Sequence, residues 1–289
     1  MSEPRLNHVQ CLSTAGLHRM AYWEWGEHSN PRVLVCVHGL SRQGRDFDTL
    51  ARALCDRYRV ICPDVMGRGA SDWRPDPALY QLPVYVADMV TLLARLDVER
   101  VDWVGTSMGG LIGLGLAALP GSPVARLVLN DVGPAIQFAA LARIGGYLGQ
   151  RMDFGNLEEG AAHLRTISAG FGPHDEAQWL ALSRPMFRPA PDGRGLRLHY
   201  DPAIAAPFAA LTPELAAAGE AQLWRAYDAL RCPTLLLRGA ESDLLARATA
   251  EAMTQRGPRA RLHEFAGVGH APTLVAADQV EVVRRFLVE

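Results

Sequence analysis

Short apolar runs alternate with helical patterns along most of this 289-residue chain. The runs are rich in β-branched residues and occupy positions 33–37, 60–62, 101–104, 124–129, 234–237 and 261–265. Helical patterns lie at 47–58, 84–96, 108–119, 244–255 and 279–287. Strands that are apolar on both faces are typical of a buried parallel sheet, and strand–helix alternation implies right-handed crossovers. The sequence therefore predicts an α/β fold with a doubly wound, mostly parallel sheet, to which residues 20–25 add an antiparallel edge strand.

The alternation stops between residues 133 and 230. This stretch is rich in Ala, Pro and Gly, shows helical patterns, and contains no convincing central strand. A long interruption of this kind is typically functional, and ligands of such sheets bind at the carboxyl edge. We therefore expect a core made of residues 1–132 and 231–289, with residues 133–230 inserted as a helical cap over that edge.

The strand at 101–104 leads into Gly105-Thr106-Ser107-Met108-Gly109, which is followed by an apolar helical pattern. A serine held on a sharp strand-to-helix turn is strained, and side chains two residues to either side of it would collide with the backbone. Glycine at both positions relieves that collision. The pattern predicts that Ser107 is a nucleophile lifted above the sheet edge, with the amino end of a helix directed at it.

A serine nucleophile needs a base, and the base needs an orienting carboxylate. His270 follows the last expected strand within Gly267-Val268-Gly269-His270-Ala271-Pro272, which makes it the candidate base. Two carboxylates could orient it. Asp243 follows the strand at 234–237 and Asp131 follows the strand at 124–129, and both strand ends lie near the expected elbow. Position along the chain leaves both open.

The oxyanion of an acyl-transfer intermediate needs backbone donors. We expect one N–H from Met108, directly after the nucleophile, and the other from Leu40 in the loop His38-Gly39-Leu40. His38 has no second histidine at metal-ligand spacing, so we interpret it as a loop brace and expect no metal. Arg42 lies just beyond this loop and is a possible binding group for a substrate carboxylate.

Composition removes several classes of function. The chain has no lysine, which excludes Schiff-base, pyridoxal-phosphate and P-loop lysine chemistry. A net charge of -2 favours neither nucleic acid nor an anionic membrane as a partner. The five cysteines are scattered without a C-x-x-C, and the amino end lacks a signal-peptide pattern, so we expect a reduced, cytoplasmic protein. No particular oligomeric state is indicated.

Taken in order, these blocks resemble the α/β-hydrolase superfamily. His38-Gly39-Leu40 is similar to its oxyanion loop, residues 62–72 to its Asp-x-x-Gly-x-Gly-x-Ser-Asp segment, and residues 105–109 to its nucleophile elbow. Residues 239–243 and 269–272 resemble its acid turn and histidine loop. Within the superfamily, the chain looks most like the capped esterase and enol-lactonase-like branch with a serine nucleophile. The resemblance implies a hydrolase without a cofactor, and it favours Asp243 over Asp131 as the acid.

The function expected from these residues is hydrolysis of a carboxylic ester through an acyl-enzyme. The candidate substrates are small-molecule esters: small or medium acyl esters, lactones or hydroxyalkanoate oligomers. Two alternatives share the same residues, namely a carbon–carbon bond hydrolase of dienoic keto acids and a non-catalytic ligand-binding member of the fold.

Overall fold

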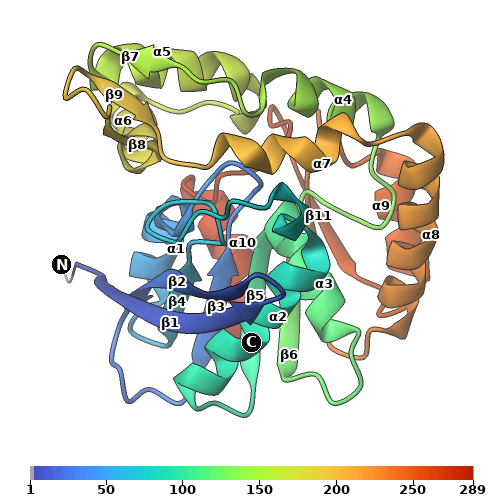
Figure 1. The fold of residues 1–289 in the computed structure, drawn as a ribbon. Coiled ribbons are helices and arrows are strands. Elements are labelled where there is room, and N and C mark those ends of the chain that lie inside the picture. The colour runs from blue at the N-terminus through green and yellow to red at the C-terminus, as the bar shows by residue number, and fades with distance from the viewer. Residues whose placement is uncertain (1–2, 289) are drawn as a thin grey trace.

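An eight-stranded mixed sheet runs through residues 3–288, the part of the chain that the computed structural model describes (Figure 1). Its strand order is β1-β2-β4-β3-β5-β6-β10-β11. The strands are β1 (Arg5–Ser13), β2 (Gly16–Trp25), β3 (Val33–Val37), β4 (Arg59–Pro63), β5 (Val101–Thr106), β6 (Val124–Asn130), β10 (Thr234–Gly239) and β11 (Arg261–Phe265). From β4 to β11 all neighbours are parallel, so the predicted α/β sheet is confirmed.

One strand was placed wrongly from the sequence. Residues 20–25 lie in β2, which is antiparallel to β4 as expected, but β2 is not the edge of the sheet. β1 pairs with β2 on its other side, from Arg5 opposite Glu24 to Ser13 opposite Gly16. β1 was not predicted because much of it is exposed and polar. It therefore lacks the continuous apolar run that marks the buried strands.

Helices cover both faces of the sheet. They are α1 (Asp48–Leu54), α2 (Leu82–Leu96), α3 (Met108–Ala117), α9 (Arg247–Gln255) and α10 (Ala277–Val288), with short 3-10 turns η1 (Gly44–Phe47) and η2 (Pro77–Leu79). Two successive residues of β3 show that helices pack on each face of the sheet. Val35 packs with the α2 and α3 side chains, whereas Leu34 packs with those of α1 and α10. Both faces are therefore buried, which explains the uninterrupted apolar runs.

The segment between β6 and β10 lies across one end of the sheet (Figure 1). It contains α4 (Phe138–Tyr147), β7 (Asp153–Phe154), α5 (Leu157–Ile167), η3 (Ala169–Phe171), α6 (Glu176–Ser183), η4 (Arg184–Met186), β8 (Phe187–Pro189), β9 (Leu196–Leu198), η5 (Pro202–Ala205), α7 (Ala206–Ala209) and α8 (Pro213–Ala229). Three of these elements form a small sheet, β7-β9-β8, whose strands are too short for a periodic pattern to reveal. α8 runs back along the side of the core (Figure 1).

Within residues 3–288, no helix combines the length and the apolar character that crossing a bilayer requires.

Candidate active site

Ser107 occupies the turn between β5 and α3 with a backbone φ of 52° and ψ of -117°. The flanking glycines are required by close backbone approach. A Cβ on Gly105 would collide with the backbone of Gly109 and Gly110, and a Cβ on Gly109 would collide with the Val37 carbonyl oxygen. The elbow is therefore set by backbone contacts between β3, β5 and α3, and Ser107 takes a conformation that is costly for a non-glycine residue.

His270 stands in the loop after β11 and faces the serine. Its Nε2 lies 3.1 Å from Ser107 Oγ, and its Nδ1 lies 2.7 Å from Asp131 Oδ2. The loop is held by Asn130 Nδ2, which donates to the Pro272 carbonyl at 2.8 Å, and by Gly269 N, which donates to the Gly170 carbonyl at 2.6 Å. With Nδ1–H donating to the carboxylate, Nε2 is left free to accept the serine proton.

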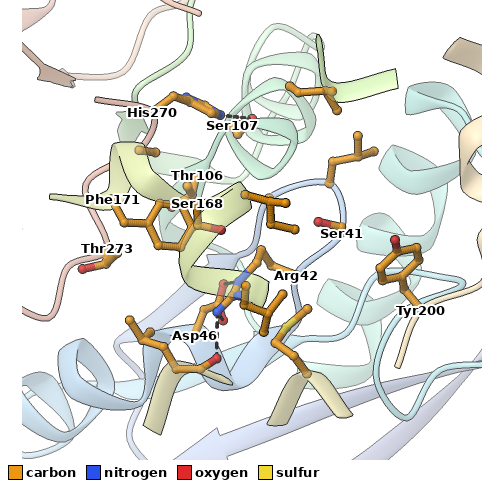
Figure 2. Close-up of a pocket in the computed structure, with 18 of the residues that line it drawn as sticks. Ser41, Arg42, Asp46, Thr106, Ser107, Ser168, Phe171, Tyr200, His270 and Thr273 are labelled. Carbon is orange, nitrogen blue, oxygen red and sulfur yellow. Dashed lines mark hydrogen bonds and ion pairs between the residues drawn. The ribbon is translucent and has the colours of Figure 1, made fainter. Parts of the chain in front are cut away.

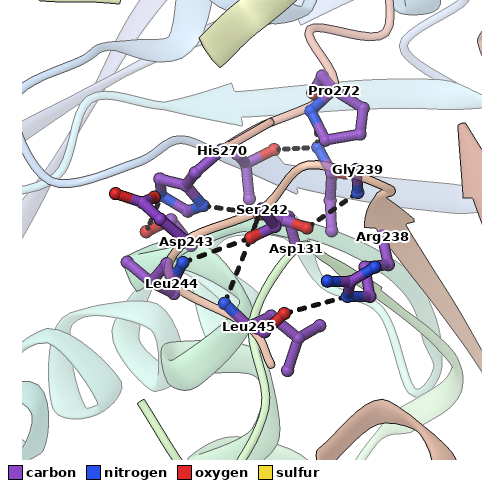
Figure 3. A network of polar contacts seen from close by, with 12 residues as sticks. Asp131, Arg238, Gly239, Ser242, Asp243, Leu244, Leu245, His270 and Pro272 are labelled. Atoms are coloured by element: carbon purple, nitrogen blue, oxygen red, sulfur yellow. Dashed lines mark hydrogen bonds and ion pairs between the residues drawn. The ribbon is translucent and has the colours of Figure 1, made fainter. Parts of the chain in front are cut away.

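The carboxylate that meets His270 is Asp131 and not Asp243, which corrects the choice made from the sequence (Figure 3). Asp131 is fully buried and follows β6 with a positive φ of 54°. The Asp243 side chain is 51% exposed, and its carboxylate forms an ion pair with Arg143 at 2.7 Å. Asp131, the alternative candidate, thus makes the contact with His270 that was expected of Asp243.

The hydrogen bonds of Asp131 explain this arrangement. Its Oδ1 accepts from the backbone N–H of Gly239 at 2.9 Å, and its Oδ2 accepts from Ser242 Oγ at 2.6 Å as well as from His270 (Figure 3). β6 and β10 are parallel neighbours, so residues after both strands reach the same sheet edge. The turn after Gly239 directs Ser242 toward Asp131. The next residue, Asp243, points to the cap.

The two expected oxyanion donors lie around the serine. Met108 is the first residue of α3, where a helical N–H has no partner within its own helix. Leu40 lines the pocket that contains Ser107, and the preceding Gly39 is next to the serine, since a Cβ there would lie in van der Waals contact with Ser107 Cβ at 3.7 Å. Both backbone groups are thus near the nucleophile, as the motifs suggested.

His38 braces this loop and is fully buried. The backbone N–H of Val65 donates to His38 Nε2 at 2.9 Å, which places the ring proton on Nδ1, 2.7 Å from the Gly39 carbonyl oxygen. Burial lowers the pKa of His38 to about 3, so the ring is neutral. The expected role as a brace agrees with these contacts.

A buried arginine that the sequence analysis did not single out supports the same loop. Arg68 is fully buried and lies in the segment 62–72. Its Nε donates to the Leu40 carbonyl at 2.7 Å and its Nη1 to the Met66 carbonyl at 2.6 Å. Because the Leu40 carbonyl is tied down, the loop that carries the Leu40 N–H is held in place. The sequence feature that could have identified Arg68 is its position between two glycines in that segment.

A pocket opens over Ser107 and His270 between the core and the cap (Figure 2). Its apolar lining includes Leu164, Ile167, Phe171, Leu182, Met186 and Leu198. Polar groups on its wall are Ser41, Arg42, Asp46, Arg143, Tyr147, Ser168, Tyr200 and Thr273. A mostly apolar pocket with a few polar groups suits a small organic ester.

Arg42 lines this pocket but is not a free cation. Its Nε and Nη2 donate to the two oxygens of Asp46 at 2.7 and 2.6 Å, and Nη2 also donates to the Leu182 carbonyl at 2.9 Å (Figure 2). The Arg42 side chain is only 11% exposed. Asp46, whose pKa is raised by burial, was missed from the sequence although the i,i+4 spacing from Arg42 could have indicated the pair.

Three potential metal ligands meet elsewhere in the described chain. Cys11, His18 and Asp88 are buried where α2 packs on β1, with their ligand atoms within 4.8 Å of one another. His18 Nε2 and Asp88 Oδ2 are already hydrogen-bonded at 3.0 Å. Burial raises the pKa of the Cys11 thiol to about 12, so the sulfur stays protonated. We interpret the cluster as a buried polar network.

Comparison with known proteins gives a family model and several relatives that match most of the chain. Residues 34–284 match the model of the "Alpha/beta hydrolase family". The chain is 57% identical over 287 residues to a 3-hydroxybutyrate-oligomer hydrolase of Cupriavidus necator, covering 99% of this chain and 98% of that protein. It is 30% identical to a 2-hydroxymuconate semialdehyde hydrolase of Pseudomonas sp. strain CF600, covering 82% and 78% of the two chains.

A solved structure agrees with these relatives. The α/β hydrolase of Novosphingobium aromaticivorans superposes with a TM-score of 0.85 at 37% identity and covers 99% of both chains. The fold and the expected ester-hydrolase class are thereby confirmed.

Proposed function

This chain belongs to the α/β-hydrolase family, and from that premise we propose that it hydrolyses the ester bonds of short 3-hydroxybutyrate oligomers with Ser107, His270 and Asp131 as its triad. The observation that carries the chemistry is the continuous contact from Asp131 Oδ2 through the His270 ring to Ser107 Oγ. The observation that favours this substrate is the similarity, along nearly the whole chain, to the Cupriavidus enzyme.

The reaction follows from the geometry. Ser107 Oγ attacks the ester carbonyl carbon while its proton passes to His270 Nε2, and Asp131 stabilises the imidazolium that forms. The N–H groups of Leu40 and Met108 bind the oxyanion of the tetrahedral intermediate. The intermediate collapses, His270 protonates the departing alkoxide, and a hydroxy acid leaves. Water then repeats the sequence on the acyl-enzyme and releases the second acid.

The pocket lining suits this substrate. A 3-hydroxybutyrate unit carries a methyl branch, an ester carbonyl and either a hydroxyl or a carboxylate at a chain end. Side chains such as Leu164 and Met186 offer an apolar surface for the methyl groups. The hydroxyls of Ser168 and Tyr200 can donate to an oxygen of the substrate, and the Asp46 carboxylate can accept from its terminal hydroxyl.

A carbon–carbon bond hydrolase is the second candidate, because the chain is also related to the 2-hydroxymuconate semialdehyde hydrolase. Purified protein should be incubated with the 3-hydroxybutyrate dimer and trimer, 4-nitrophenyl butyrate and a dienoic keto acid. We expect release of 3-hydroxybutyrate from both oligomers with a higher kcat/KM than for 4-nitrophenyl butyrate. Turnover of the keto acid in preference to the oligomers would instead establish carbon–carbon cleavage.

A further inference from the structure

Two arginines line the pocket that contains Ser107, and they differ in how firmly they are held. Arg42 makes three hydrogen bonds to Asp46 and the Leu182 carbonyl, and its side chain is 11% exposed. Removing Arg42 from that pair would leave the Asp46 carboxylate, whose side chain is only 20% exposed, without its cationic partner, which is unfavourable. Arg42 is therefore unsuited to exchange its partner for a substrate.

Arg143 is held much more loosely. It comes from α4 of the cap, and its Nε and Nη2 both reach a single oxygen, Oδ2, of Asp243 at 2.9 and 2.7 Å. The two side chains are 46% and 51% exposed. Ion pairs as exposed as this one contribute little stability, so either partner can be replaced at low cost. A bound carboxylate could thus take the guanidinium from Asp243.

The position of this pair relative to the triad specifies which part of a substrate it would meet. Asp243 directly follows Ser242, whose Oγ contacts the same Asp131 oxygen as His270 Nδ1. The ion pair therefore lies on the histidine side of the site. His270 delivers its proton to the departing oxygen, so the leaving group exits on that side.

One turn along α4, Tyr147 lines the same pocket and adds a second donor. Burial raises the pKa of Tyr147 even though the charge of Arg143 and a hydrogen bond between the two side chains oppose the rise, so its hydroxyl remains protonated. A guanidinium and a neutral hydroxyl are both groups that bind a carboxylate.

We propose that Arg143 is a subsite for the carboxylate of the leaving group, with Asp243 as the competing internal anion that holds the guanidinium when the site is empty. The proposal rests on the proposed function. An oligomer cut at its last ester bond releases a monomer whose carboxylate lies three carbons from the departing oxygen, and Arg143 would bind that terminal carboxylate. The enzyme would then shorten oligomers from their acid end.

The test uses substrate pairs in which one member carries a free carboxylate and the other its methyl ester, with cleavage followed at the ester bond that both members share. The first pair is the 3-hydroxybutyrate dimer and its methyl ester. The second pair is 3-(butanoyloxy)butanoate and its methyl ester, which carry the same leaving groups but no hydroxyacyl unit. The third pair, monomethyl and dimethyl succinate, places the charge in the acyl group instead. For each pair, the measured quantity is the ratio of kcat/KM for the charged member to that for the neutral one.

We expect Arg143→Gln to lower this ratio about tenfold for the first two pairs and to change it less than twofold for the succinates. Arg143→Lys, which keeps the charge but loses the planar fork, should lie between the two. Asp243→Asn should raise the ratio severalfold, since the guanidinium loses its competitor. Arg165→Gln, on an exposed position of α5, is the matched arginine control and should leave the ratio at the wild-type value.

Three other outcomes would overturn the proposal. Equal losses for the charged and neutral members in Arg143→Gln would show that the residue only supports the cap. A lowered ratio for the succinates would place the subsite on the acyl side. Loss of all turnover in Asp243→Asn would assign that residue to the triad. If the dimer is not cleaved but 3-(butanoyloxy)butanoate is, the proposed substrate fails while the second pair still decides the subsite.

Discussion

Asp131 Oδ2 lies 2.7 Å from His270 Nδ1, although 139 residues separate the two along the chain. The carboxylate therefore comes from the end of β6, before the cap begins, and not from the turn after β10. Ser242 stands at that turn and donates to the same oxygen. The carboxylate that contacts His270 and the turn after β10 therefore belong to different strands, and the hydrogen bond from Ser242 to Asp131 connects them.

Replacement of Ser107 by alanine should abolish esterase activity. The variant removes the attacking oxygen while the elbow, which is set by backbone contacts, stays formed. We expect kcat to fall by about 10⁴-fold or more, with an unchanged circular dichroism spectrum. A fluorophosphonate probe should label the wild-type protein at Ser107 and leave Ser107→Ala unlabelled. An inert serine in folded wild-type protein would favour the ligand-binding alternative.

The choice of acid can be tested by two matched substitutions. Asp131→Asn keeps the shape of the side chain but cannot stabilise the imidazolium, so we expect kcat to fall about 10³- to 10⁴-fold. Asp243→Asn should retain turnover because that carboxylate contacts Arg143 and not His270. Steady-state kinetics on a neutral ester distinguish the two. The reverse order of effects would restore Asp243 as the orienting residue.

A carboxylate placed in the turn after β10 should be able to replace Asp131, which follows β6, as the partner of His270. Ser242 Oγ lies 2.6 Å from Asp131 Oδ2, so a carboxylate at position 242 can approach the histidine once residue 131 is shortened. We expect the double variant Asp131→Ala/Ser242→Asp to exceed Asp131→Ala in kcat by about tenfold. Asp131→Ala/Ser242→Asn is the control without the charge. Equal rates for the two double variants would argue against a movable acid.

His38 should make the fold sensitive to mild acid. Its pKa is about 3 in the folded protein, while an unperturbed histidine titrates near 6.5. Between these values the unfolded chain binds a proton that the folded chain does not, so stability falls as the pH falls from 6.5 toward 3. At pH 5.5 the loss should be about 1–2 kcal/mol relative to pH 8. Urea unfolding of wild type and His38→Gln at both values measures it, and an equal decrease in the variant would refute it.

The elbow glycines should be intolerant of a methyl group. A Cβ on Gly109 would meet the Val37 carbonyl oxygen, which belongs to the buried strand β3 and cannot move freely. We expect Gly109→Ala to lower the free energy of unfolding by about 3 kcal/mol or more. Gly146→Ala in α4 is the matched control, because a Cβ there meets nothing within 4 Å. That variant should be neutral or slightly more stable, since alanine favours helices.

The sequence by itself determined the sheet core and singled out Ser107 and His270 as the candidate nucleophile and base. Buried parallel strands need apolar residues on both faces, and the elbow needs glycine at 105 and 109, so both leave local patterns that can be read directly. β1 left no such pattern because much of it is exposed, and the short strands of the cap left none because two or three residues show no period.

Only the tertiary structure decided between the two acids. β6 and β10 are adjacent parallel strands, so Asp131 and Asp243 both follow strands that end at the same sheet edge. Which carboxylate turns inward depends on the backbone after each strand, where Asp131 takes a positive φ and the turn after Gly239 presents Ser242. The partner of Asp243 is an arginine of the cap, 100 residues away, and no local pattern records such a contact.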